Sequence, residues 1–388
     1  MSPWTTPERQ ALRQAVTDFT KAEIVPHLDQ WEDDGILPRE LHQKTADAGF
    51  LGIGFPEEAG GAGGDLVDAY VAAEAMLLAG ASGGVQASLF THSIAVPHII
   101  DSVRSGGGNP DLIDRYVRPT LAGEKIGSLA VTEPGGGSDV AGIRTRAVRD
   151  GDDYIVNGAK MFITSGVRAD FVTTAVRTGE AGHGGISLLV IDKGTPGFTV
   201  SRSLRKMGWH CSDTAELAFD NVRVPATNLV GEENSGFYQI AQQFVAERLS
   251  LAVTGYATAQ RCLDLAVAYA KDRDTFGRPL STRQVIRHKL VDMHARIAAA
   301  RALTRQAVER SLTTTKSDPS MILDAVIAKD QAIACAEHVA HEAVQIFGGM
   351  GYMRETEVER HYRDVRILGI GGGANEVMRD LAAKLMGL

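Results

Sequence analysis

The sequence predicts an α+β fold that is mostly α, with an N-terminal helical domain, a middle antiparallel β domain and a C-terminal four-helix bundle. Three observations predict it. Residues 1–122 carry apolar side chains at helical spacing. Residues 123–235 alternate strand-like runs with turn signals. Residues 236–388 contain long helical runs joined by short breaks, which is typical of an antiparallel bundle.

The first domain contains several helix signals. Residues 7–28 have apolar positions at helical spacing, and Thr6 is a suitable N-cap before Pro7. A second helix is predicted to end at Gly49, because glycine readily adopts the conformation that closes a helix. A glycine-rich loop follows around residues 54–64, and further helices are predicted over residues 65–79, 84–102 and 111–121.

The middle domain contains short runs that alternate with turns. Asn157-Gly158 is a tight-turn signal after the second of them. The pattern predicts a small antiparallel sandwich or barrel, with strands over residues 126–131, 147–156, 171–177, 186–192, 198–201 and 215–224.

The C-terminal domain contains the longest helical runs. Gly277 and Pro279 break the first of them, and the glycines of residues 348–351 stop the third. Helices are predicted over residues 237–273, 283–312, 320–347, 355–365 and 375–386. A sheet domain between two helical layers creates clefts at both junctions, where small-molecule sites often lie.

Composition excludes several classes of function. With 388 residues and a net charge of −8, the chain has no general basic field for nucleic acid or an acidic membrane. No apolar run is long enough to span a bilayer, and the N-terminus lacks the apolar core of a secretory signal. Three widely spaced cysteines form no metal-ligand pattern and no even disulfide set, so we expect no metal and a cytoplasmic location.

The most informative stretch is residues 131–139, Val-Thr-Glu-Pro-Gly-Gly-Gly-Ser-Asp, which follows a predicted strand. Three glycines let the backbone approach a ligand and point N–H groups at it, and Ser138 adds a hydroxyl. Such a turn suits a phosphate or the edge of a flat ring, although it also describes an ordinary surface turn. A second segment places Phe162 and Thr164 on one face if it is extended, where they could support a flat cofactor.

A candidate base lies on the predicted helix over residues 237–273. Glu247 shares a helix face with Ile240, Phe244, Leu251 and Thr254. A carboxylate among such side chains is partly desolvated, which raises its pKa and makes it a stronger base. On the helix alone, pairing with a buried arginine such as Arg248 or Arg301 explains Glu247 equally well.

Two further segments are weaker signals. The stretch 273–279 reads as a solvated helix end, and the glycine run 369–373 lacks the strand-then-helix context of a dinucleotide fingerprint. His338 and His341 are three residues apart on a predicted helix, but no Cys or His elsewhere completes a metal set.

In this order, the motifs resemble those of the acyl-CoA dehydrogenase family, and the resemblance covers essentially the whole chain. Residues 131–139 resemble its flavin and thioester signature, and residues 157–164 its second flavin segment. The segments 273–277 and 345–352, with Gln284, resemble the signature that holds the FAD of a neighbouring subunit.

The resemblance implies an enzyme of fatty acid metabolism and β-oxidation that binds FAD and a fatty acyl-CoA, passes electrons to electron transfer flavoprotein, and forms a homotetramer built as a dimer of dimers. It implies FAD contacts at Leu129, Val131, Thr132, Ser138, Phe162, Thr164, Arg273, Thr275, Phe276, Gln284, Gln345, Gly348, Gly349, Asn375 and Glu376. It implies acyl-CoA contacts at Ser138, Phe244, Val245, Arg248, Gly372 and Gly373.

One departure from the family pattern concerns the base. Many relatives carry the catalytic Glu at the position matched by Gly372, whereas a branch resembling isovaleryl-CoA and long-chain dehydrogenases carries it on the long helix before an Arg. Glu247-Arg248 matches that second position, so the resemblance implies Glu247 as the base. Gly371 stands where relatives often have Tyr, which suggests a roomier acyl pocket, and Ala374 replaces a frequent Thr.

The expected reaction is α,β-dehydrogenation of an acyl-CoA to the trans-2-enoyl-CoA, with Glu247 taking the α-proton and the flavin N5 taking hydride. Donors at the thioester oxygen, the Gly372 N–H among them, would stabilise the enolate. Three alternatives stay open. They are an acyl-CoA oxidase or flavin monooxygenase on the same fold, a non-catalytic subunit of a mixed assembly, and a helical scaffold without ligand.

Overall fold

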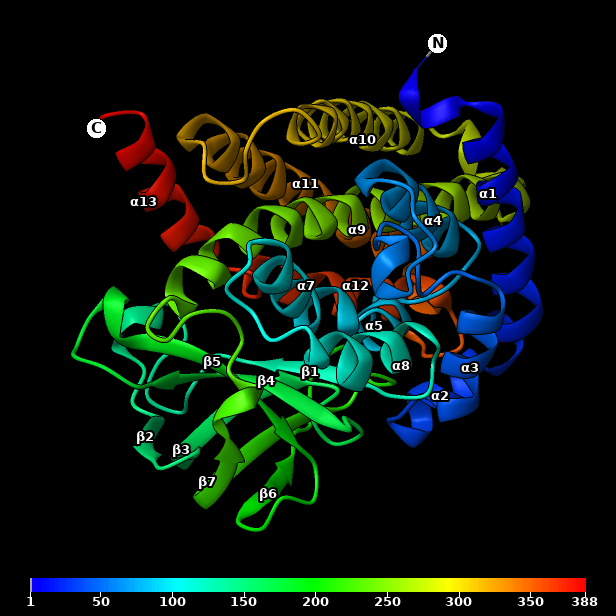
Figure 1. Ribbon diagram of the computed structural model, residues 1–388. Helices are drawn as coiled ribbons and strands as arrows, with labels where there is room; N and C mark the ends of the chain where they lie inside the picture. Colours follow the sequence, from blue (N-terminus) through cyan, green and yellow to red (C-terminus); the bar gives the residue numbers. More distant parts are fainter. Residues whose placement is uncertain (1) are drawn as a thin grey trace.

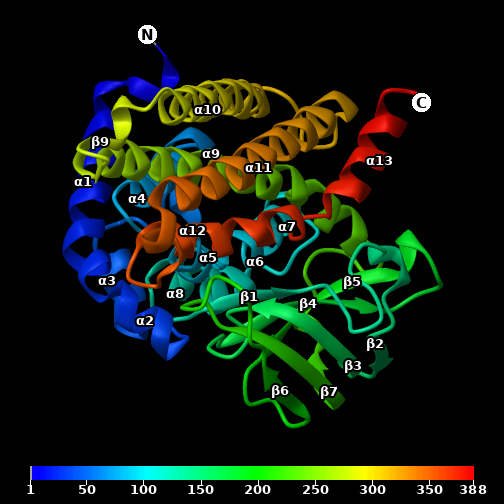
Figure 2. The same ribbon diagram turned by 180° about the vertical axis from the view of Figure 1, so that it is seen from behind.

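The computed structural model describes residues 2–388 and has the predicted order of helices, sheet and helices. Figure 1 shows the sheet below the long C-terminal helices, with the N-terminal helices packed along one side. Figure 2 shows from behind that α11 and α12 lie between the sheet and α10. The fold class is therefore α+β and mostly α, as predicted.

The N-terminal helices begin where the sequence predicts. The Thr6 hydroxyl accepts the N–H of Arg9 and caps α1 (Pro7–Phe19). Helical backbone then continues through a π turn and a 3-10 turn into α2 (Leu28–Asp34), which the sequence analysis did not predict. The next two helices along the chain are α3 (Arg39–Asp47) and α4 (Leu66–Leu78).

The single helix predicted over residues 84–102 is wrong. The segment forms α5 (Gly83–Leu89), α6 (His92–Ala95) and α7 (Pro97–Arg104). Proline has no N–H to donate, so Pro97 interrupts the helix and opens a new one. The predicted helix over residues 111–121 contains a π turn at Ile113–Val117 and ends in α8 (Arg118–Leu121).

The middle sheet is mixed rather than wholly antiparallel. Strand β4 pairs in parallel with β1 and, at one position, with β2, and it pairs antiparallel with β5. The order is β1-β4-β2-β3-β7-β6, with β5 on β4. The strands are β1 (Gly127–Ala130), β2 (Arg146–Asp150), β3 (Asp153–Thr164), β4 (Phe171–Arg177), β5 (Ile186–Asp192), β6 (Phe198–Ser203) and β7 (Thr214–Pro225).

The turn predicted at Asn157-Gly158 is also wrong, because both residues lie inside β3. The reversal falls earlier, at Gly151 and Asp152 between β2 and β3, where Gly151 has a φ of 62°. Gly158 instead marks an irregularity in the β3–β7 pairing, and a Cβ there would lie 2.6 Å from the Thr145 hydroxyl. The asparagine accepts the N–H of Asn221 on β7.

The C-terminal helices match the predicted ranges within a few residues. They are α9 (Gly236–Asp272), α10 (Gln284–Ser311), α11 (Pro319–Phe347), α12 (Glu357–Asp364) and α13 (Asn375–Leu385), with the short hairpin β8 (Asp274–Thr275) and β9 (Arg278–Pro279) between α9 and α10. The main core joins α4 to α9, α10 and α11. A second core packs α7 and the start of α9 on β4 and β5, so α9 contacts both helical layers and the sheet.

Candidate active site

The glycine loop after β1 leaves open space beside its backbone. Glu133 and Gly136 exchange both backbone hydrogen bonds at 3.1 Å, which closes the turn. A Cβ added at Gly135 or Gly136 would have no atom within 4 Å, and Ser138 is exposed. Val131 and Thr132 are half-buried at the start of the loop. A ligand therefore has access to the N–H groups of this loop.

A buried ion pair that the sequence analysis missed holds the loop in place. The Glu133 carboxylate accepts the N–H groups of Arg144 and Thr145 and the Lys160 ammonium, the last at 2.9 Å. Burial raises the pKa of Glu133, but the Lys160 charge and these hydrogen bonds outweigh that effect, so the pKa of Glu133 lies below its ordinary value. Burial lowers the pKa of Lys160 to about 8. The two motif segments thus share an internal anchor.

The second segment lies against the first. The Met161 N–H donates to the Thr132 carbonyl at 2.8 Å, and pairing with β7 is irregular between Lys160 and Ile163. Phe162 has a φ of 62° and is 62% exposed, so the regular alternation that predicted a shared face with Thr164 does not apply. Such a backbone costs an aromatic residue on the order of 1–3 kcal/mol, and strain of this kind clusters at functional sites.

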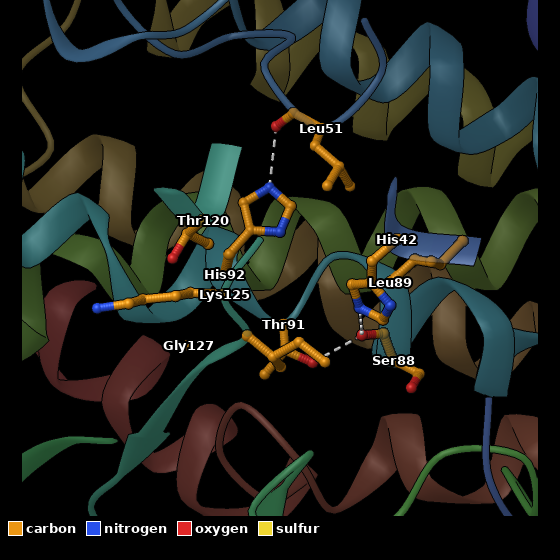
Figure 3. A pocket seen from close by; sticks show the side chains of 10 residues that line it. His42, Leu51, Ser88, Leu89, Thr91, His92, Thr120, Lys125 and Gly127 are labelled. Atoms are coloured by element: carbon orange, nitrogen blue, oxygen red, sulfur yellow. Dashed lines mark hydrogen bonds between the residues drawn. The ribbon is translucent and has the colours of Figure 1, made fainter. Parts of the chain in front are cut away.

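The back of β1 is filled by buried histidines rather than by a ligand cavity. Figure 3 shows His42 and His92 around a space that has no room for a water molecule, bounded also by Gly127 of β1. The His92 Nε2 lies 3.0 Å from the Leu51 carbonyl, and burial lowers the pKa of His92 to about 4. These neutral rings support β1 from the N-terminal domain.

Glu247 lies on α9 and is half-buried. Among residues 2–388 no side chain forms an ion pair or hydrogen bond with its carboxylate, so the alternative of a paired structural carboxylate does not describe this structure. Arg301 instead lies over the Tyr256 ring. Burial raises the pKa of Glu247, and the charges of Arg248 and Lys329 lower it in part.

The loop before α13 approaches Glu247. Gly372 and Gly373 have φ values of 63° and 99°, which favour glycine. A Cβ at Gly372 would lie 2.6 Å from the Leu251 Cδ1 and 3.5 Å from the Glu247 Oε1. The Glu247 carboxylate therefore occupies the space into which a side chain at residue 372 would project.

The predicted substrate residues on α9 lie within one helical turn of Glu247. Arg248 is 6% exposed, and its guanidinium carbon lies 5.2 Å from the centre of the Phe244 ring. Its Nε is buried and has no hydrogen-bond partner among residues 2–388. Val245 is buried in the main core, so its side chain contributes packing.

The remaining predicted cofactor residues fall into two groups. Asn375 begins α13 next to the glycine loop, its Oδ1 is buried without a partner, and Glu376 beside it is exposed. The second group lies at the other end of α9, about 39 Å from Glu247 at 1.5 Å per residue. Its exposed members are Arg273, Phe276, Gln284, Gln345, Gly348 and Gly349, and Thr275 is half-buried.

This distal group presents unusual apolar exposure. Phe276 is 99% exposed with a φ of 51°, and Tyr352 is 85% exposed. Tyr269 at the end of α9 stacks on Phe347 at the end of α11, with ring centres 4.1 Å apart, so the two motif segments share one end of the bundle. Within a single chain this end does not meet the loop after β1.

One hollow is separate from the predicted contacts. A cavity of about 370 Å³ lies between α7 and the first turns of α9, lined by His98, Asp101, Tyr238, Gln239 and Gln243 among others. Gln243 is about one helical turn before Glu247. None of the predicted substrate residues lines this hollow.

A helical layer, a sheet domain and a helical bundle, with the Glu247 carboxyl beside a glycine loop of the bundle, define the class as a three-part α–β–α protein with a candidate small-molecule site. Models of the acyl-CoA dehydrogenase N-terminal, middle and C-terminal domains match residues 6–124, 128–222 and 234–387. The chain therefore belongs to the acyl-CoA dehydrogenase family, a family of enzymes that act on acyl-CoA.

Individual relatives match along nearly the full length. The mitochondrial long-chain specific acyl-CoA dehydrogenase of Mus musculus is 36% identical over 381 residues, covering 97% of this chain and 86% of its own. An acyl-CoA dehydrogenase structure from Mycobacterium smegmatis has 59% identity and a TM-score of 0.96, covering 100% of this chain and 99% of its own. A glutaryl-CoA dehydrogenase from the same organism, solved with FADH2, has 25% identity and a TM-score of 0.88, covering 99% and 96%.

Two features are absent from residues 2–388. No helix there combines the length and apolarity needed to cross a bilayer. No group of three His, Cys, Asp or Glu side chains there could hold a metal ion.

Proposed function

We propose that this protein catalyses the FAD-dependent α,β-dehydrogenation of a fatty acyl-CoA, with Glu247 as the base that removes the α-proton. The observation that carries the proposal is the unpaired, half-buried carboxyl of Glu247 beside Gly372. Family membership supplies the reaction class. The position of Glu247 next to the loop at Gly372 is the reason for choosing Glu247 as the base.

The residues present fit FAD. The open glycine loop, the strained and exposed Phe162, and the unpartnered Oδ1 of Asn375 are features that a flat cofactor with a pyrophosphate would use. Leu129, Val131, Thr132, Ser138, Phe162 and Thr164 would hold one part of it, and Asn375 and Glu376 at the start of α13 would hold another. Bound FAD would supply the acceptor for the hydride from the β-carbon. The FADH2 in the related glutaryl-CoA dehydrogenase supports this assignment.

Proton removal depends on groups of this chain. Desolvation makes the Glu247 carboxylate a stronger base, and the neighbouring cations keep it from holding its proton too tightly. No acceptor within residues 2–388 takes the N–H of Gly372, so this group is free to donate to a thioester oxygen as negative charge develops there. Arg248 adds buried positive charge nearby.

The distal group would act on the flavin of another subunit. This group lies at the end of the bundle where α9 and α11 end, too far from Glu247 to share a site with it in the same chain. Its members are Arg273, Thr275, Phe276, Gln284, Gln345, Gly348 and Gly349. The exposed Phe276 and Tyr352 suit burial by a second copy. A homotetramer built as a dimer of dimers, electron transfer flavoprotein as acceptor and a cytoplasmic location belong to the same proposal.

The test replaces Glu247 with Gln in the purified flavoprotein. Glu247→Gln keeps the shape of the side chain but removes its basicity, so anaerobic bleaching of the flavin by acyl-CoA should be lost. Exchange of the α-proton with deuterated water, in a thioester analogue that resists oxidation, should be lost as well. Asp264→Asn, which changes an exposed carboxyl on the same helix, is the matched control and should retain both activities. Bleaching by Glu247→Gln at the wild-type rate would refute the assignment.

A separate experiment determines which acyl chain the enzyme prefers. Gly371 leaves space on the same loop, because a Cβ there would meet only the Ile367 carbonyl, at 3.5 Å. A panel of straight, branched and ring-bearing acyl-CoA thioesters, compared by kcat/KM, assigns the substrate class within this reaction.

A further inference from the structure

A buried lysine on α11, one of the two cations near Glu247, lies against the candidate site. Lys329 is 1% exposed. Among residues 2–388 no carboxylate lies within 4.0 Å of its ammonium, although buried lysines are normally paired. Its ammonium instead donates to the Gly373 carbonyl at 2.5 Å. A buried cation that forgoes an ion pair to hold one loop carbonyl calls for an explanation.

The loop and the base meet at the same point beside Lys329. The position of a Cβ at Gly372 lies 3.5 Å from the Glu247 Oε1 and 3.8 Å from the Lys329 Cε. The lysine side chain is therefore within about 7 Å of the carboxylate. Its hydrogen bond fixes Gly373, the residue after the one whose N–H is the candidate donor to the thioester oxygen.

We propose that Lys329 is a positioning residue for this reaction: it anchors the Gly372–Gly373 loop and keeps the Glu247 carboxyl ionised for proton removal. This inference rests on the proposed function. Lys329 does not touch the reacting atoms. It acts through the Gly373 carbonyl and through its charge.

The charges around Glu247 support this role. The cations that act on its carboxyl are Arg248 on its own helix and Lys329 on α11. Asp330, the next residue on α11, is paired with Arg379, so most of its charge is balanced outside the site. Burial lowers the pKa of Lys329 to about 8, and the Glu247 charge partly offsets that effect. Two cations, Arg248 and Lys329, therefore act on one carboxyl, a balance that favours an anion forming on the substrate.

The test is the pH dependence of α-proton exchange in Lys329→Met, a variant of similar size without charge. Loss of the Lys329 charge, which lowers the pKa of Glu247, should raise that pKa and move the acid limb of the exchange profile upward by about one pH unit. Lys329→Arg, which keeps the charge, should leave the limb near its wild-type position. Lys384→Met, an exposed lysine on α13, is the matched control and should not move it.

A second measurement does not depend on turnover. Carbon-13 labelling of glutamate carboxyls, with the Glu247 signal identified by its loss in Glu247→Gln, gives the titration of Glu247 directly. Its midpoint should rise in Lys329→Met by the same interval as the exchange profile. The role of Lys329 would be overturned if, in Lys329→Met, both the titration midpoint of Glu247 and the acid limb of the exchange profile stayed at their wild-type pH values. In that case, loss of exchange in Glu247→Gln would still support the proposed function.

Discussion

The contact between Gly372 and α9 gives a prediction whose size follows from the structure. Gly372→Ala places a Cβ 2.6 Å from the Leu251 Cδ1, and it does so at a φ of 63°. The left-handed backbone costs an L-residue roughly 1–2 kcal/mol, and overpacking typically costs about 1–3 kcal/mol. We expect Gly372→Ala to lower the free energy of unfolding by about 3 kcal/mol.

A double-mutant cycle separates the two contributions. Leu251→Ala alone should cost about 2 kcal/mol, because Leu251 is half-buried against the main core. In the double variant the clash between residues 372 and 251 disappears, so only the backbone strain and the lost packing remain. The loss of the double variant should therefore be smaller than the sum of the two single losses by about 1–3 kcal/mol. Urea unfolding followed by circular dichroism measures all four proteins.

The control and the refuting result are defined by the same geometry. Gly184→Ala adds a Cβ where no atom lies within 4 Å and φ is −82°, so its effect should stay within about 0.5 kcal/mol. If Gly372→Ala and Leu251→Ala were additive, the 2.6 Å contact would not govern the loop, and the argument that Glu247 fills the space beside residue 372 would lose its basis.

Two other predictions concern stability. The folded state holds His92 with a pKa of about 4, below its ordinary 6.5, so the unfolded chain takes up the proton first as pH falls. Stability should therefore be lost as the pH falls from 6.5 to 4, by about 3 kcal/mol for this residue. The urea midpoint of His92→Gln should fall less steeply with decreasing pH than that of the wild type. Equal pH slopes of the two urea midpoints would contradict this prediction. Glu133→Gln leaves the Lys160 ammonium buried without its carboxylate partner and should lower the free energy of unfolding by about 3 kcal/mol. Most of this loss should be recovered in the double variant Glu133→Gln with Lys160→Met. Equal losses in the single and the double variant would show that the ion pair does not cause the destabilisation.

The sequence by itself determined the kinds of element and singled out a candidate base. Apolar spacing predicted the long helices α9, α10 and α11, and alternating runs predicted β4 and β5 with their observed bounds. These patterns are local, because a helix or strand repeats its buried face every few residues. The same local pattern singled out Glu247 as a carboxyl on an apolar face, while pairing with an arginine remained equally consistent with it.

Tertiary structure decided which of those residues meet. The parallel pairing of β4, the Glu133–Lys160 anchor and the Lys329 bond to Gly373 all depend on neighbours distant in sequence. Periodicity carries no information about distances between segments dozens of residues apart. Only the packed chain leaves Glu247 unpaired beside Gly372, because burial and the identity of the nearest charge are properties of the assembled core.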